Sequence, residues 1–291
     1  MKHDKSKHIY IKKKAVKNIS NVDDLIKSEL NNYIDDVTNI TNFLENDYDE
    51  HSLHQMRVSL RKIKSLVYFF NNLLNEDVFT SIKNSIHKLI SPTSKARDYD
   101  IVKSNYLSPA YLKNKVEYEE FMAHSLNEIQ KLQNNTSKIL NSNQYQNRLI
   151  DLRNLINNSN WDNLSLVYSR RSLGNYIEKR INKEPDSIYS KAKDCHHLPH
   201  KKLHHLRIKI KELRYVIEIL EPFIKHYKCI LKNLNNLQDI LGEINDTYSA
   251  AMIIKDLNIS EHLSSHHKDI KNMILNHRKS NIHKLKYQLY L

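Results

Sequence analysis

Two stretches of the sequence read LHQMRVSLRKIKSLVYFF, from Leu53 to Phe70, and LHHLRIKIKELRYVIEIL, from Leu203 to Leu220. In both, apolar residues recur at steps of three and four, which is the pattern of a helix that buries one face. At a constant offset of 150 residues, six core-type positions of the first meet core-type positions of the second. They pair Met56, Leu60, Ile63, Leu66, Val67 and Phe70 with Leu206, Ile210, Leu213, Val216, Ile217 and Leu220. This repetition predicts an internal duplication, and hence two helical bundles with approximate two-fold symmetry.

The remaining sequence supports a helical fold. Downstream of the repeated stretches, Arg97-Asp98 matches Asn245-Asp246 at an offset of 148 residues. The 291 residues include only 2 glycines and 5 prolines, which excludes a glycine-rich phosphate loop or a dinucleotide-binding turn. Because turn formers are scarce, the sequence predicts long helices joined by short polar loops, an all-α fold class.

Helical periodicity sets the expected elements. It predicts helices over residues 25–44, 51–74, 76–90, 94–106, 108–140, 144–156, 164–182, 200–220, 222–257 and 266–290. We expect a basic tail at residues 1–17 and one duplicated domain over 18–289, with bundles over about 18–140 and 141–289.

Cys195 and Cys229 lack the spacing of a disulfide framework or metal site, and we expect both to be reduced and inert. Without an apolar leader or a membrane-spanning run, a cytoplasmic protein is the default expectation.

The excess positive charge is concentrated in two segments. The formal net charge is +13, of which residues 1–17 contribute +6 and residues 191–232 contribute +7. A local excess of this kind favours a polyanionic partner: nucleic acid, an anionic membrane surface or an inorganic phosphate polymer.

Each repeated helix presents a basic face opposite its apolar face. The first carries His54, Arg57, Arg61 and Lys64 within an arc of about 80°. The second carries His204, Arg207, Lys211 and Arg214 in the same arrangement. Ten residues of helix span about 15 Å, so such a row can follow several successive phosphates. Arginine suits phosphate because its planar fork donates two charge-assisted hydrogen bonds.

A solvated face paired with acids is the alternative interpretation of these rows. Two observations weigh against it. Glu212 is the only acid between the ends of either row. The basic spacing also survives duplication although positions expected to face solvent differ, with Lys62 against Glu212 and Ser65 against Tyr215.

Other polar residues have competing interpretations. His54 and His204 can donate a ring N–H to a phosphate oxygen or satisfy a neighbouring backbone group, and both readings stay open. For Asp98, Asp100 and Asp246 we favour a structural role, such as holding an arginine or bridging helices, over catalysis. His196, His197, His200, His204 and His205 suggest metal binding, but Pro199 disturbs the helix and no carboxylate has a companion spacing, so we predict no metal site.

At these residues the sequence resembles the CHAD family, the conserved-histidine α-helical domains. DYDEHSLHQMRVSLRKIKSL, from Asp47, resembles the family's first signature, and LHHLRIKIKELRY resembles the second. KARDYDIV and LQDILGEINDTYSAAMII resemble the segments that follow each, so the similarity covers about residues 20–287. The resemblance implies two four-helix bundles about a pseudo-two-fold axis, with basic helices lining a central cavity or groove. It also implies binding of inorganic polyphosphate and association with polyphosphate granules.

The resemblance assigns the polyphosphate ligands residue by residue. They are His54, Arg57, Arg61 and Lys64 in the first half and His204, Arg207, Lys211 and Arg214 in the second, with Lys62 and Lys209 as neighbours. Arg97, Asp98 and Asp246 are assigned to structural support. The sequence departs from the family at Glu212, where a base is usual, and at Asn245, where an arginine would match Arg97.

The leading functional hypothesis is a polyphosphate-binding protein without cofactor or catalysis. Relatives with a fused triphosphate-cleaving domain carry a Glu-x-Glu-x-Lys signature, whereas Glu117-Tyr118-Glu119 leads to Phe121. The alternative is a metal-dependent phosphohydrolase or phosphotransferase acting on polyphosphate or nucleotides, which requires a metal site or a positioned nucleophile. Nucleic-acid binding ranks third because the basic rows lack interleaved aromatic residues for base stacking.

Overall fold

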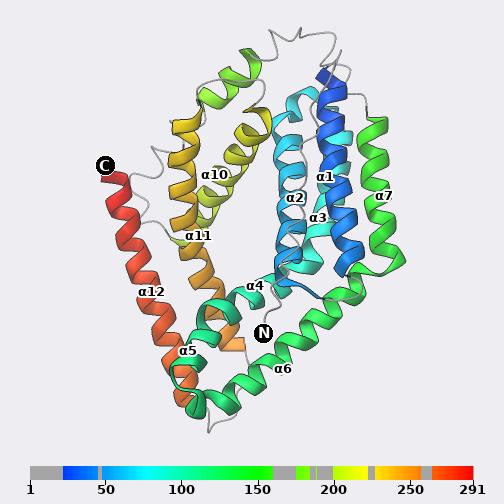
Figure 1. Ribbon diagram of the computed structural model, residues 1–291. Coiled ribbons are helices and arrows are strands. Elements are labelled where there is room, and N and C mark those ends of the chain that lie inside the picture. The colour runs from blue at the N-terminus through cyan, green and yellow to red at the C-terminus, as the bar shows by residue number, and fades with distance from the viewer. Residues whose placement is uncertain are drawn as a thin grey trace, which may run out of the picture.

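The computed structural model describes residues 22–44, 48–159, 175–183, 188, 199–221, 227–256 and 264–290. These residues form helices and short connections with no strand among them, which confirms the all-α prediction (Figure 1). The basic tail at 1–17, Cys195 and most of the helix expected over 164–182 lie outside this part of the chain. Within it, no helix has the length and apolar character that crossing a membrane requires.

The helices follow the expected order along the chain. They are α1 (Val22–Leu44), α2 (Glu50–Phe69), α3 (Glu76–Ile90), α4 (Ser94–Val102), α5 (Ser108–Lys113), α6 (Lys115–Leu140), α7 (Asn143–Asn158), α10 (His200–Leu220), α11 (Lys228–Asp256) and α12 (Ser264–Tyr290). Short helical turns connect some of them: the 3-10 turns η1 (Asn71–Leu73) and η2 (Ser91–Thr93), and the π-helical turn η3 (Lys103–Leu107).

Several expected helices differ from the structure: those expected over 51–74 and 94–106 end as α-helices at Phe69 and Val102. The helix expected over 108–140 is broken at Asn114, whose φ of −148° and ψ of 88° end α5. The Asn114 side chain then accepts a hydrogen bond from the backbone N–H of Glu117, at 3.4 Å, and begins α6. Asparagine favours such caps because its side chain competes for nearby backbone groups. The helix expected to start at residue 222 begins at Lys228.

The repeated stretches form α2 and α10, and their six matched core-type positions are buried in both helices. Asp49 caps α2, since its carboxylate accepts a hydrogen bond from the backbone N–H of Ser52 at 2.7 Å. The expectation that Ser65 and Tyr215 face solvent is wrong, because they are only 2% and 3% exposed. Both helices pack against neighbours on more than one side, so these positions are covered as well.

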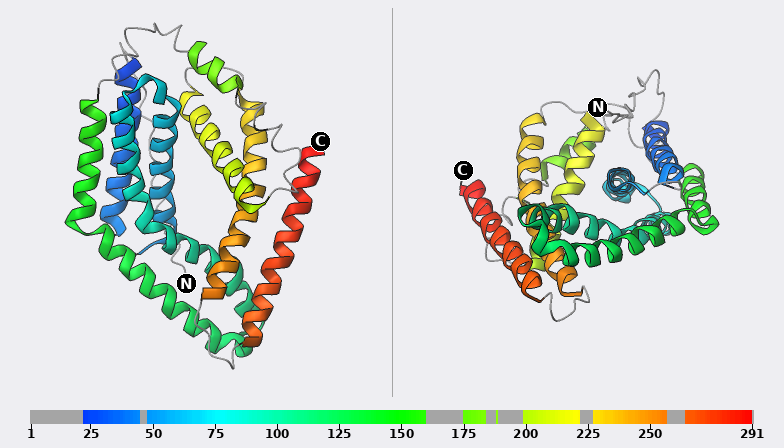
Figure 2. Two further views of the ribbon diagram at one scale, coloured as in Figure 1. Left: turned by 180° about the vertical axis from the view of Figure 1, so that it is seen from behind. Right: turned by 60° about the horizontal axis from the view of Figure 1, so that its bottom comes forward.

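The packing places α2 and α10 side by side in the middle of the molecule (Figure 1). α1, α2, α3 and α7 pack in a ring, although α7 lies beyond the expected boundary between residues 140 and 141. On the other side α10 packs on α11, which also contacts α4 and α12. Figure 2 shows α6 running from α5 to α7 along one side of both groups. A larger apolar core fills the ring and continues to α10 and α11, and a smaller one lies among α4, α6, α11 and α12.

Candidate functional site

The predicted basic rows meet where α2 packs against α10. Arg61 of α2 lies close enough to Arg207 and Lys211 of α10 for their charges to interact. Arg61 and Lys211 occupy equivalent positions of the repeat, and both side chains are half-buried. Neither has a hydrogen-bond or ion-pair partner among the described residues. The structure therefore brings together the central basic residues of the two rows.

Lys211 has an unusual electrostatic environment. Burial is the main cause that lowers the pKa of its ammonium group to about 6, and the charges of Arg207 and Arg61 lower it further. The carboxylate of Asp246 acts in the opposite direction but does not restore the ordinary value. Near pH 7 the unliganded side chain is therefore mostly a neutral amine.

Two carboxylates lie beside this cluster, Asp98 on α4 and Asp246 on α11. Nη2 of Arg207 lies 3.8 Å from Oδ1 of Asp246, which is longer than a direct hydrogen bond. Burial raises the pKa of Asp98; the charge of Arg57 lowers it, and that of Asp246 raises it. Both aspartates thus lie beside arginines, and their expected structural role stays a prediction.

Arg57 is the most enclosed of the predicted ligands, at 5% exposure. Its Nη1 donates to the backbone oxygen of Ile90 at 3.0 Å and to the hydroxyls of Thr93 and Ser94. Burial is the main cause that lowers its pKa to about 10. Arg57 thus fastens α2 to the C-terminal end of α3, where a cation also meets the negative end of the helix dipole. Its Nε, like that of the equivalent Arg207, is buried without a hydrogen-bond partner.

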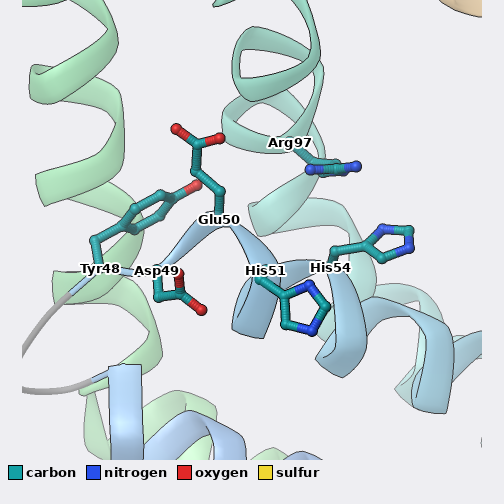
Figure 3. Close-up of a pocket in the computed structure, with 6 residues that line it drawn as sticks. All are labelled: Tyr48, Asp49, Glu50, His51, His54 and Arg97. Atoms are coloured by element: carbon teal, nitrogen blue, oxygen red, sulfur yellow. The ribbon is translucent and has the colours of Figure 1, made fainter. Parts of the chain in front are cut away.

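His54 and Arg97 line an open pocket at one end of the first row (Figure 3). The pocket has a volume of about 510 Å³ and is completed by Tyr48, Asp49, Glu50 and His51. Burial, followed by the charges of Arg97 and Arg61, lowers the pKa of His54 to about 4. The imidazole is therefore neutral at pH 7, chiefly because it is buried.

The second half is built differently at the equivalent position. Nδ1 of His204 lies 2.6 Å from Oδ1 of Asn245, so the ring donates to the amide oxygen there. Asn245 occupies the position of Arg97 in the first half. The second half therefore has a hydrogen-bond acceptor where the first half has a cation. Next to it, the ring of His200 stacks on Tyr248 with centroids 3.5 Å apart.

At the other end of the rows the cations are paired. Nζ of Lys64 lies 3.3 Å from Oε1 of Glu212. Arg214 donates to Glu218 at 2.7 Å and to Gln238 at 2.8 Å. The interpretation of a solvated face paired with acids therefore applies to this end, and the acids that neutralise it come from α10.

The two predicted neighbours lie away from the contact. The ammonium of Lys62 sits over the ring of Tyr33 on α1, 5.0 Å from its centroid. Lys209 is exposed on α10. Two residues correspond to about 200° of helical rotation, so Lys209 and Lys211 occupy opposite faces.

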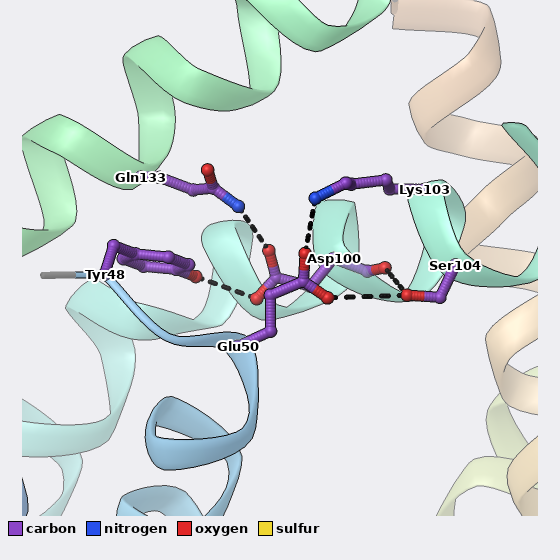
Figure 4. Close-up of polar contacts among 6 residues, drawn as sticks. All are labelled: Tyr48, Glu50, Asp100, Lys103, Ser104 and Gln133. Carbon is purple, nitrogen blue, oxygen red and sulfur yellow. Dashed lines mark hydrogen bonds and ion pairs between the residues drawn. The ribbon is translucent and has the colours of Figure 1, made fainter. Parts of the chain in front are cut away.

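A separate polar network holds α4 beside the start of α2 (Figure 4). The fully buried carboxylate of Asp100 accepts hydrogen bonds from the hydroxyl of Tyr48 at 2.8 Å and from Gln133 at 2.9 Å. Lys103 pairs with Glu50 at 2.6 Å. Burial raises the pKa of Asp100 despite these donors. Asp100 thus connects α4 to Tyr48, just before α2, and to Gln133 on α6.

The histidines considered for metal binding are only partly described. His200 and His204 have ring centroids 6.1 Å apart, and the Nδ1 of His204 is already engaged by Asn245. Among the residues with described placement, no group of three or more His, Cys, Asp or Glu side chains is arranged to hold a metal ion. His196 and His197 lie outside those residues.

Comparison with known proteins decides the family. The CHAD domain model matches residues 33–255. The chain belongs to the CHAD domain family. Its fold is similar to the crystal structure of the CHAD domain from the plant Ricinus communis, with a TM-score of 0.77 at 18% identity, covering 93% of this chain and 92% of that one. It is also similar to PptA from Streptomyces chartreusis, with a TM-score of 0.67 at 11% identity, covering 93% of this chain and 99% of that one. No curated protein matches the chain in sequence.

Several residues that shape this CHAD domain escaped the sequence analysis. Thr93 orients Arg57, and Tyr48 holds Asp100, although neither carries a charge that periodicity would single out. Gly242 lies on α11 beside Arg207, whose Nε would be 3.8 Å from a Cβ at that position. Glycine is rare in this sequence, and a glycine inside a helix usually has a packing reason. That could have drawn attention to Gly242.

Proposed function

We propose that this protein binds inorganic polyphosphate at the cationic cluster between α2 and α10, without catalysis of its own. The observation that carries the proposal is that equivalent residues of the two repeats, Arg61 and Lys211, meet at one helix contact without a hydrogen-bond partner in the described part of the chain. Half-buried basic side chains that have no partner in the described part of the chain favour an anionic ligand, which in turn favours the charged form of Lys211. Membership of the CHAD family supports polyphosphate as that anion.

In this proposal the central contacts come from Arg61, Arg207 and Lys211. Arginine forks suit successive phosphoryl oxygens, and binding releases the counterions of the polymer. His54 and Arg97 extend the site into the open pocket, where both side chains lack hydrogen-bond partners among the described residues.

The remaining predicted ligands take outer or supporting places. Arg57 supports the site by holding α2 against the end of α3 through its hydrogen bond to the backbone oxygen of Ile90. Lys64 and Arg214 add charge at the paired end of the rows, and His204 contributes through the nitrogen that Asn245 does not engage.

Titration calorimetry with polyphosphates of defined length tests the proposal. We expect affinity to rise with chain length, because one polymer meets both helices, and to fall steeply with salt. Replacing Arg61 and Arg207 together by Gln should weaken binding at least tenfold. Lys209→Gln is the matched control, since it removes one charge from the exposed face of α10 and should change affinity less than twofold. Equal losses per charge removed would implicate general attraction and contradict the proposed site.

Two further measurements address catalysis and location. Incubation of polyphosphate with the protein and Mg²⁺ or Mn²⁺ should release no phosphate; release that is lost in His54→Ala would contradict a purely binding role. In cells that store polyphosphate, a tagged protein should collect on the granules, and the double arginine variant should not.

A further inference from the structure

We infer that anion binding at this site is coupled to uptake of a proton by Lys211, so that the protein holds polyphosphate more tightly as the pH falls. This inference rests on the proposed function and adds a regulation to the same site. Its basis is geometric: Lys211 lies half-buried where α10 packs against α2, and its ammonium group has no hydrogen-bond or ion-pair partner among the described residues.

The cluster around Lys211 is predominantly cationic. The charged and titratable groups that face it are Arg61 and His54 on α2, Arg207 and Arg214 on α10, and Asp246 on α11, with Asp98 on α4 beside the arginines. Arginine stays protonated throughout the physiological range, so its charge cannot adjust. Lys211 can adjust its charge: burial of its side chain is the main cause that favours the neutral amine, and the charges of the neighbouring arginines add to it.

A bound polyanion reverses this balance. Burial and the neighbouring guanidinium groups bring the pKa of Lys211 down to about 6 in the unliganded protein. Phosphoryl oxygens at the same place favour the charged ammonium, so its pKa rises and a proton is taken up. By linkage, a ligand that binds one extra proton gains up to about tenfold in affinity for each unit of pH decrease. The gain is confined to pH values between the unliganded and liganded pKa.

The duplication itself provides the comparison that isolates this effect. Arg61 stands at the position equivalent to Lys211, so one half of the site has a fixed charge and the other a variable one. Lys211→Arg makes the second half resemble the first. Lys211→Met keeps a similar length but removes the charge at every pH.

The test measures polyphosphate binding to the full chain by calorimetry at pH 6.5, 7.2 and 8.0, in buffers of different ionisation enthalpy. For the wild type we expect more than half a proton taken up near pH 7.2 and at least a threefold gain in affinity from pH 8.0 to 6.5. In Lys211→Arg the gain should vanish with tight binding throughout. In Lys211→Met it should vanish with weak binding throughout. Phosphates at the polymer ends titrate identically in all three proteins and cancel in the comparison.

The outcomes separate this inference from the proposed function. Binding with the same proton uptake in wild type and both variants would overturn the role of Lys211 and leave polyphosphate binding intact. Binding by the wild type without proton uptake would do the same. Absence of any binding heat or any polymer-dependent stabilisation would overturn both together.

Discussion

Nζ of Lys64, in the first repeat, lies 3.3 Å from Oε1 of Glu212, in the second, so an acid of one half neutralises a base of the other. Position 212 is equivalent to Lys62, which means that one repeat has an acid where the other has a base. Together with the pair between Arg214 and Glu218, this contact satisfies one end of the basic rows. The cations available to a ligand are therefore concentrated around Arg61 and the open pocket.

Removing that acid should strengthen polyphosphate binding. In Glu212→Gln, Lys64 loses its partner and becomes available to the polymer. We expect affinity to rise about threefold to tenfold, with a salt dependence steeper by about one phosphate contact. Because both side chains are about one-third exposed, at 34% and 29%, the loss of the pair should cost less than about 1 kcal/mol of folding stability.

Asp35→Asn is the control for this change. Asp35 pairs with Arg153 at 2.6 Å between α1 and α7, away from α2 and α10. The substitution alters the net charge by the same amount, and polyphosphate affinity should stay within twofold of the wild type. A comparable gain in both variants would show that only net charge matters.

The same substitution at Arg57 and at Arg61 should have different effects on the free energy of unfolding. Arg57→Met removes the buried donor that Ile90 and Thr93 share, so we expect a loss of about 2–3 kcal/mol in the free energy of unfolding. Arg61→Met removes a cation from a repulsive cluster and should leave stability unchanged or slightly increased. Urea denaturation of the unliganded proteins measures both, and an equal loss in the two variants would contradict the distinction.

The stability of the unliganded protein should rise with pH. Folding lowers the pKa of Lys211 from 10.5 to about 6, so between these values the unfolded chain binds more protons and alkali favours the folded state. His54, lowered from 6.5 to about 4, adds the same trend in that lower range. We expect a higher free energy of unfolding at pH 8.5 than at pH 6.5, in buffers without phosphate or sulfate. Lys211→Met should flatten this dependence, and an unchanged slope would exclude Lys211 as its source.

Asn281 on α12 should be a site of easy stabilisation. Its side chain is 0% exposed, and both amide atoms lack hydrogen-bond partners in the described structure. Burying such a group costs free energy that an apolar side chain of similar size does not. We expect Asn281→Leu to raise the free energy of unfolding by about 1–2 kcal/mol, with a higher melting temperature. Asn281→Asp should lower it sharply; a loss in both variants would reveal a hydrogen-bonding role for the amide.

The sequence was most informative where periodicity and repetition coincide. It predicted the all-α class, the bounds of α3 and α10, and the buried faces of α2 and α10, because burial of an apolar stripe determines all of these. It did not predict the break at Asn114, since a cap depends on backbone angles that hydrophobic spacing leaves open.

The sequence predicted which residues belong to the candidate site, but not which of them are buried, paired or without a partner. Helical spacing placed Arg57 and Arg61 on one face. Only the three-dimensional structure shows that Arg57 donates a hydrogen bond to the end of α3, whereas Arg61 has no partner among the described residues. Likewise, Glu212 was a departure from the family pattern in the sequence, and packing of α10 on α2 turns it into a partner of Lys64. Such differences arise between helices, beyond the reach of a single helical pattern.

The paired ends of the basic rows also limit how much polymer one molecule can cover. His54 and Arg61, which lack partners among the described residues, are separated by only seven residues of helix, about 10 Å. If the protein binds polyphosphate as proposed, a long strand would extend well past each bound molecule. Many copies of the protein would then bind along a single strand at intervals. The phosphates between them would stay accessible to enzymes that lengthen or degrade the strand.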